Sequence, residues 1–131
     1  MKTRGFIGLG TMGFPMAGFI SKEYPTYVFN RTAAKAENWV KTYKGDVRNS
    51  PAELGNVCDE IYMCIGNDDD VREVISGENG ILSSISPGGI IVDHTTTSSI
   101  LSNDMSEMCL QKGVHYIDAP VSGGQAGAEN G

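Results

Sequence analysis

The chain has 131 residues, a formal net charge of −6 at pH 7 and 40% hydrophobic residues, which suits a single domain that needs no disulfide or metal to hold its core. Its lysines and arginines are scattered singly, so no basic stripe is available for a phosphate backbone and we expect no nucleic-acid partner. No apolar run approaches the roughly 20 residues that span a bilayer, and no signal-peptide pattern opens the chain, so we expect a cytoplasmic protein without a membrane partner.

A glycine pattern, G-x-G-x-x-G, is formed by Gly8, Gly10 and Gly13 between a predicted strand over residues 3–7 and a predicted helix that ends near Lys22. The first glycine permits a tight turn, the second lets backbone amides approach a pyrophosphate, and the third lets the helix pack on the strand. Together with the positive end of the helix, they predict a dinucleotide site. A purely structural turn is the alternative, and the flanking strand and helix patterns favour cofactor binding.

A second predicted strand, residues 26–29, ends about 20 residues further on, where ribose recognition is expected. The polar run there is Asn30, Arg31 and Thr32, and Thr32 is placed to cap a helix over residues 33–42. An acid in this run would bind two ribose hydroxyls and repel a 2′-phosphate, whereas a guanidinium attracts the phosphate. Arg31 therefore predicts NADP, with NAD possible; the alternative is a surface arginine without a role.

A brief third strand is predicted over residues 46–48, followed by a short helix. Ser50 precedes a proline at the first helical position, and Glu53 completes a capping-box pattern. We expect Gly55 and Asn56 to end this helix.

Residues 60–65 are nearly all apolar, as in a strand buried on both faces of a parallel sheet. Asp68, Asp69 and Asp70 then open a predicted helix, where carboxylates cap the first turn and complement its dipole. The same acids could be read as a metal cluster. No histidine lies near and consecutive helical residues point in different directions, so we predict no metal.

The next predicted elements are a short helical turn within residues 80–86 and an apolar strand over 89–93, which opens into a polar run. His94 begins that run, and we interpret it as a rim residue rather than an acid or base.

A predicted helix follows, capped by Ser98 or Ser99. Lys112 and Gly113 close it as a cation at the C-terminal dipole and a glycine beyond the last turn. The last predicted strand covers residues 114–119.

Cysteine use suggests reduced structural thiols. Cys58, Cys64 and Cys109 are odd in number, and none belongs to a C-x-x-C pair.

Strands and helices alternate along the whole chain, which predicts an α/β fold: a Rossmann-type, doubly wound parallel sheet with helices on both faces. Ligands of such sheets bind beyond the carboxyl ends of the strands, so five polar turns should line one edge. They are residues 8–13, 30–32, 66–67, 93–98 and 122–124.

Four motifs resemble the β-hydroxyacid dehydrogenases, the group that contains 3-hydroxyisobutyrate dehydrogenase and tartronate semialdehyde or glyoxylate reductases. The motifs are G-F-I-G-L-G-T-M-G at residues 5–13, P-M-A at 15–17, N-R-T at 30–32 and D-A-P-V-S-G-G at 118–124. The resemblance covers essentially the whole chain and implies an N-terminal NAD(P)-binding domain.

The resemblance also implies roles for individual residues, from the pyrophosphate to the substrate. The pyrophosphate would lie against Gly8, Leu9, Gly10, Thr11, Met12 and Gly13; the adenosine ribose against Asn30, Arg31 and Thr32; the adenine side against Ile65 and Gly66; and the nicotinamide against Thr96. The substrate carboxylate would bind Ser122, Gly123 and Gly124. The substrate itself would be a small hydroxyacid.

The family's general acid is a lysine in a downstream glycine-rich helical segment, which lies beyond Gly131. We expect the lysines of this chain to lie far from the cofactor edge; they are Lys2, Lys22, Lys35, Lys41, Lys44 and Lys112. Residues 1–131 would then be an incomplete Rossmann domain, truncated before its last strands and lacking a C-terminal helical substrate and dimerisation domain. We expect no catalytic residue in this chain, negligible turnover, an exposed strand edge and a homo-oligomeric intact protein.

The function that these features predict is hydride transfer between NADP and a small β-hydroxyacid or its semialdehyde. An imine reductase shares the glycine turn and the N-R-T run, and the Ser122–Gly124 loop argues against it. A noncatalytic dinucleotide-binding module is the other alternative.

Overall fold

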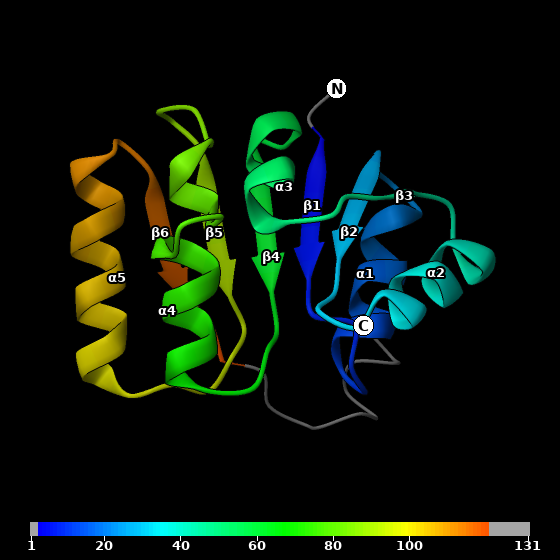
Figure 1. Cartoon of the computed structure of the whole chain (residues 1–131), viewed down its shortest axis with the longest axis horizontal. Helices are drawn as coiled ribbons and strands as arrows, with labels where there is room; N and C mark the ends of the chain where they lie inside the picture. Colours follow the sequence, from blue (N-terminus) through cyan, green and yellow to red (C-terminus); the bar gives the residue numbers. More distant parts are fainter. Residues whose placement is uncertain (1–2, 121–131) are drawn as a thin grey trace.

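The computed structural model describes residues 3–120, which form one six-stranded sheet with the strand order β3-β2-β1-β4-β5-β6. Every strand pair is parallel, so all carboxyl ends meet at one edge (Figure 1). The strands are β1 (Arg4–Ile7), β2 (Thr26–Phe29), β3 (Asp46–Val47), β4 (Glu60–Met63), β5 (Ile90–Asp93) and β6 (His115–Asp118). The predicted parallel α/β sheet is confirmed.

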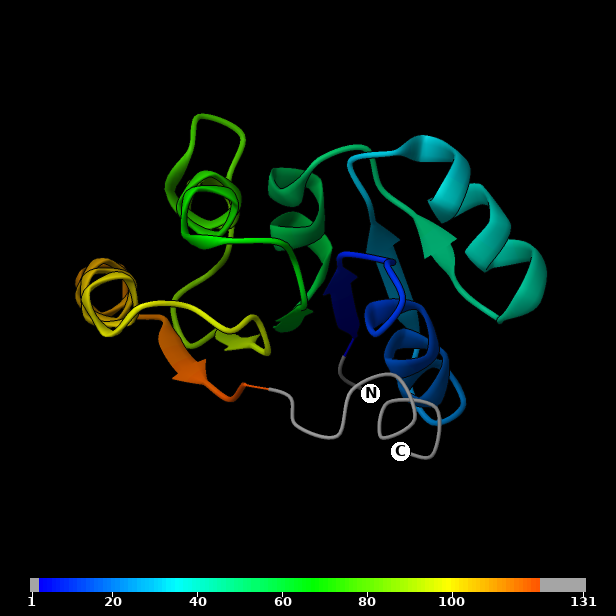
Figure 2. The ribbon, with the colours of Figure 1, turned by 90° about the horizontal axis from the view of Figure 1, so that it is seen from below.

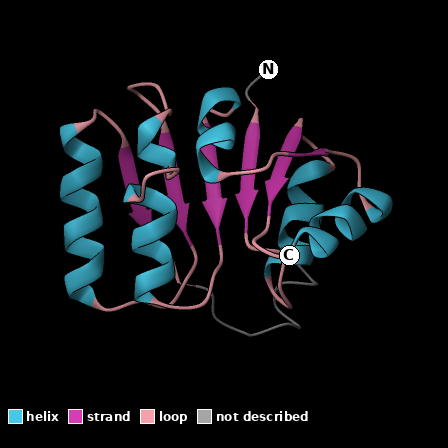
Figure 3. Ribbon diagram, viewed as in Figure 1, coloured by secondary structure: helices cyan, strands magenta, loops and turns pink. Residues whose placement is uncertain are grey.

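Helices connect the strands along the whole described chain (Figure 3). They are α1 (Gly13–Ser21), α2 (Ala33–Thr42), α3 (Pro51–Val57), α4 (Asp68–Ser76), the 3-10 turn η1 (Ile81–Ser83) and α5 (Ser99–Gln111). Helices α3, α4 and α5 cover one face of the sheet, and α1 lies on the other (Figure 2). None of the helices within residues 3–120 is long and apolar enough to cross a membrane.

Two apolar clusters hold the helices to the sheet. The larger one packs Ile61, Met63 and Ile91 against the buried sides of α3, α4 and α5. The smaller one joins Phe6 and Val28 to α1 and α2 and includes the fully buried Trp39. Both faces of β1 and β2 are therefore covered, as a doubly wound sheet requires.

Strand β4 is more one-sided than its apolar sequence predicts. Ile61 and Met63 are fully buried, whereas Glu60 and Tyr62 on the other face are only half-buried. The strand also ends earlier than residue 65. The N–H of Ile65 leaves the sheet ladder because it donates to Thr95 Oγ1 at 2.9 Å.

Helix ends follow the expected caps at three places. Ser50 Oγ accepts from the N–H of Glu53 at 3.1 Å, and Ser98 Oγ accepts from the N–H of Leu101 at 3.1 Å. Gly113 follows α5 with a φ of +74°, in the left-handed region that glycine adopts freely. These three helix ends can therefore be predicted from the local sequence.

Three predictions about helix ends were wrong in part. Gly55 and Asn56 do not end α3; Gly55 is buried inside it, where a Cβ would lie 2.2 Å from Ser84 Oγ, so the glycine serves close packing. The cap of α4 is Asn67, whose Oδ1 accepts from the N–H of Asp70 at 3.0 Å, and the aspartates form the first turn. Thr32 occupies the cap position of α2, but its hydroxyl makes no cap hydrogen bond.

The three cysteines are free, as predicted, and two of them are buried in the core. Burial raises the pKa of Cys58 to about 12 and that of Cys109 to about 11. Because thiolates are the reactive species, we expect both thiols to resist a disulfide reagent in the native protein and to react after denaturation. Thiol titration with and without denaturant measures this, and rapid native reaction of more than the half-buried Cys64 would contradict it.

Candidate functional site

A cavity of about 480 Å³ opens at the carboxyl ends of β1, β2 and β4. In the observed strand order, β1 and β4 are neighbours whose connections run in opposite directions, and this switch point is where ligands of such sheets bind. The cavity is lined by Gly8, residues 10–13, residues 30–32 and Ile65–Gly66. It therefore brings together every predicted cofactor residue except Leu9 and Thr96.

The three glycines of the turn have different roles in the structure. Gly8 has a φ of +99°, and a Cβ there would lie 2.2 Å from the Cys64 carbonyl oxygen. A Cβ on Gly13 would lie 1.8 Å from the Gly8 carbonyl oxygen. Gly10 is different because its φ is not left-handed and a Cβ would meet nothing within 4 Å. The fold requires Gly8 and Gly13, whereas Gly10 keeps open space beside the turn.

Backbone donors are available at that open space. Among the residues that the structure describes, none accepts a hydrogen bond from the N–H of Gly10, Thr11 or Met12. The first turn of α1 follows directly, and Phe14 N–H donates to the Gly10 carbonyl at 3.0 Å. Free N–H groups beside a helix N-terminus form an anion site, so this turn fits a pyrophosphate.

Leu9 and Asn30 support the turn from behind. Leu9 is buried, and its N–H donates to Asn30 Oδ1 at 2.8 Å. Asn30 Nδ2 donates to the Thr32 carbonyl at 3.0 Å. The Asn30 amide thus joins the glycine turn to the loop between β2 and α2, which is a bracing contact that the sequence did not predict.

Arg31 has a partner that the sequence did not predict. Its Nη2 lies 2.8 Å from Asp70 Oδ1, on the first turn of α4, although the two residues are 39 positions apart. The hydrogen bond to Asp70 raises the pKa of Arg31. The Arg31 side chain remains 75% exposed at the rim of the cavity.

A second cation, Lys35, also lines the cavity. It corrects the expectation that all lysines lie far from the cofactor edge. Lys35 is the third residue of α2, so a cation in the first turn of the helix that follows the N-R-T run is the signal that could have found it.

Thr96 lies in a neighbouring hollow of about 400 Å³ that shares Gly66 with the main cavity. The loop that carries Thr96 is anchored by buried groups. Asp93 is fully buried and accepts from Tyr116 Oη at 2.7 Å and from Thr95 N–H at 2.9 Å. Thr95 Oγ1 in turn accepts from Ile65 N–H. Asp93 therefore links β5 to β6 through Tyr116 and to the end of β4 through Thr95.

His94 has two contacts that hold it at the end of β5. Its ring stacks on Tyr62 with centroids 6.1 Å apart, and its Nδ1 lies 2.8 Å from the Ala119 carbonyl oxygen. These contacts give His94 a supporting role for the loop. Two of the three aspartates after β4 have separate partners, since Asp68 bonds Ser98 and Asp70 bonds Arg31.

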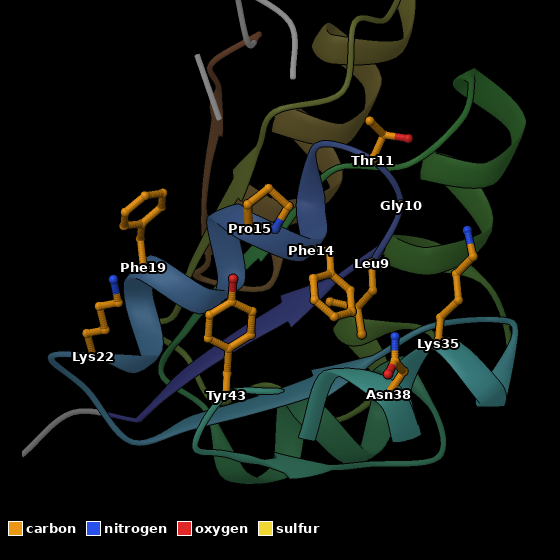
Figure 4. A pocket seen from close by; sticks show the side chains of 10 residues that line it. All are labelled: Leu9, Gly10, Thr11, Phe14, Pro15, Phe19, Lys22, Lys35, Asn38 and Tyr43. Carbon is orange, nitrogen blue, oxygen red and sulfur yellow. The ribbon is translucent and has the colours of Figure 1, made fainter. Parts of the chain in front are cut away.

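A larger cavity of about 630 Å³ lies between α1 and α2 (Figure 4). Phe14 and Tyr43 face each other there with ring centroids 5.8 Å apart, and Phe19 lies at its edge. It shares Gly10, Thr11 and Lys35 with the first cavity. Volume alone would favour it, but it lacks the strand ends that gather the predicted site residues. The predicted substrate residues Ser122, Gly123 and Gly124 lie outside the described residues.

Known proteins are similar to this chain over almost its whole length. Residues 3–131 match the family model of the NAD binding domain of 6-phosphogluconate dehydrogenase. The chain is 47% identical over 127 residues to an uncharacterised oxidoreductase of Shewanella frigidimarina, covering 96% of this chain and 44% of that protein.

Two solved structures are also similar to this chain over almost its whole length. Mycobacterium tuberculosis 3-hydroxyisobutyrate dehydrogenase with L-serine has a TM-score of 0.88 at 26% identity, covering 99% of this chain and 44% of that one. Psf3 in complex with NADP+ and 2-OPP has a TM-score of 0.88 at 27% identity, over 97% and 45% of the two chains. This chain thus spans less than half the length of these relatives.

Proposed function

The chain belongs to the 3-hydroxyisobutyrate (β-hydroxyacid) dehydrogenase family, as its N-terminal NAD(P)-binding domain, and from this premise we propose that it binds NADP in preference to NAD. The observation that carries the proposal is the cavity at the switch point, which joins the open turn at Gly10 to the cations Arg31 and Lys35. No acid stands among Asn30, Arg31 and Thr32 to repel a 2′-phosphate. The structure of the similar protein Psf3 holds NADP+.

The residues of this chain would bind and orient the cofactor. The free N–H groups after Gly10 and the N-terminus of α1 would hold the pyrophosphate. Arg31 and Lys35 would hold the 2′-phosphate, and Thr96 would lie on the nicotinamide side. When bound, the nicotinamide supplies the hydride chemistry.

For the whole protein we propose hydride transfer between NADP and a small β-hydroxyacid or its semialdehyde. Ser122, Gly123 and Gly124 would receive the substrate carboxylate through a hydroxyl and backbone N–H groups. Proton transfer would fall to a lysine outside this chain, so the 131 residues alone should bind cofactor and turn over negligibly.

Replacing Arg31 with alanine tests the cofactor preference. Loss of a charge-assisted contact to the 2′-phosphate should weaken NADP binding by roughly 10- to 100-fold and leave NAD binding within about twofold. Calorimetric titration of both cofactors measures the two dissociation constants.

The matched control is Arg72→Ala. Arg72 is also a partly exposed arginine paired with an aspartate, Asp104 at 3.1 Å, but it does not line the cavity. The control should bind both cofactors as the parent does. Equal losses of NADP and NAD in Arg31→Ala would contradict the 2′-phosphate role and leave Arg31 a structural residue.

A further inference from the structure

The Arg31–Asp70 ion pair crosses the adenosine end of the cavity. Arg31 comes from the loop after β2, and Asp70 comes from the first turn of α4, which follows β4. Both residues line the cavity. Asp70 Oδ2 also lies close to Gly66, where an added Cβ would be 3.0 Å away. The carboxylate therefore lies between the segment expected at the adenosine ribose and the segment expected at the adenine side.

The position of Asp70 is fixed by its helix, because its N–H donates to the capping Asn67. The two aspartates that precede it do not share its role. Asp68 Oδ2 accepts from Ser98 Oγ at 2.6 Å, and Asp69 is exposed and makes no side-chain hydrogen bond or ion pair with any residue from 3 to 120. Asp70 is thus the member of this acidic run that faces the arginine.

We propose that Asp70 is a specificity-determining residue that lowers the preference of this domain for NADP over NAD. The proposal rests on the proposed function, because it assigns Asp70 to the place where Arg31 would receive the 2′-phosphate. The 2′-phosphate of NADP would compete with the carboxylate for the guanidinium and would lie near that negative charge. NAD has no 2′-phosphate, so it can bind while the ion pair stays closed.

The charge alone can be removed by the isosteric change Asp70→Asn. We expect the NADP dissociation constant to fall about 10-fold, since both competition and repulsion are removed, while that for NAD stays within about twofold. Fluorescence or calorimetric titration at fixed ionic strength measures both constants. The effect should shrink as salt is added, because exposed charges are screened.

Asp69→Asn is the matched control, since it removes the same charge one residue away on the same helical turn. Tighter NADP binding in Asp70→Asn but not in Asp69→Asn supports the proposal. Equal tightening in both variants overturns it, because the effect would then be one of net charge.

A double substitution separates this inference from the proposed function. In an Arg31→Ala background, Asp70→Asn should have less than half of its effect, measured on a logarithmic scale, because the carboxylate acts largely through the guanidinium. If Arg31→Ala weakens NADP while Asp70→Asn changes nothing, the Asp70 inference fails and the proposed function stands. If the folded parent chain binds neither cofactor, the proposed function itself fails, and this inference with it.

Discussion

Replacing Gly10 with valine should weaken NADP binding by about 100-fold or more and leave the unfolding temperature nearly unchanged. The added side chain would enter open space, since a Cβ at Gly10 meets no atom within 4 Å. It would instead hold a pyrophosphate away from the N–H groups of the turn, and two lost charge-assisted hydrogen bonds of about 1.5–3 kcal/mol each account for the loss. Titration with NADP and thermal unfolding on the same sample measure the two quantities.

Gly13→Ala is the contrasting variant. Its Cβ would overlap the Gly8 carbonyl oxygen, so the fold itself should be destabilised. If Gly10→Val lowered the unfolding temperature and the folded fraction still bound NADP normally, the glycine turn would be structural and the pyrophosphate site would be wrong.

Replacing Asp93 with alanine should cost about 2–6 kcal/mol of unfolding free energy and weaken cofactor binding as well. The buried carboxylate accepts from Tyr116 Oη and Thr95 N–H, and each donor left without a partner costs about 1–3 kcal/mol. Thr95 also holds the N–H of Ile65 at the end of β4, so the loss should spread to the adenine-side turn. Denaturant unfolding gives the free energy, and NADP titration gives the effect on the site.

Asp118→Ala is a control at the matching register position on the next strand. Asp118 pairs with Asp93 across β5 and β6, but it is exposed and accepts only from Ser102 Oγ among its described hydrogen-bond partners. Its loss should cost about 1 kcal/mol or less. Equal destabilisation by both substitutions would contradict the role given to the buried network.

Much of the fold could be predicted because its signals are local. The caps at Ser50 and Ser98, the glycine after α5 and the apolar strand cores each follow from a few neighbouring residues. The site edge then follows from the rule that parallel strands place their carboxyl ends together. For the same reason the glycine turn, residues 30–32 and Ile65–Gly66 meet as predicted.

What could not be predicted depends on contacts between distant residues. Gly55 is typical of a helix end, but it lies inside α3, where Ser84, directly after η1, packs closely against it. The partner of Arg31 is 39 residues away, and no local pattern in the acidic run selects Asp70 over Asp69. The buried Asp93 likewise accepts a hydrogen bond from Tyr116, which comes from another strand.

Two contacts that the sequence did not predict, the Asp93 network and the Arg31–Asp70 pair, have different roles in the site. The Asp93 network fixes the loop on the β5 side of the switch point, where Thr96 lies. The Arg31–Asp70 pair joins the loop after β2 to the first turn of α4, at the rim of the cavity. One is buried and should affect stability and binding together, whereas the other is exposed and should affect the choice of cofactor with little effect on stability.

A calorimetric titration of this chain with NADP and with NAD at equal ionic strength tests the dinucleotide site most directly. We expect both cofactors to bind one site and NADP to bind more tightly. Tighter binding of NAD would contradict the role of Arg31. Binding of neither cofactor by a chain that circular dichroism shows to be folded would contradict the dinucleotide site itself.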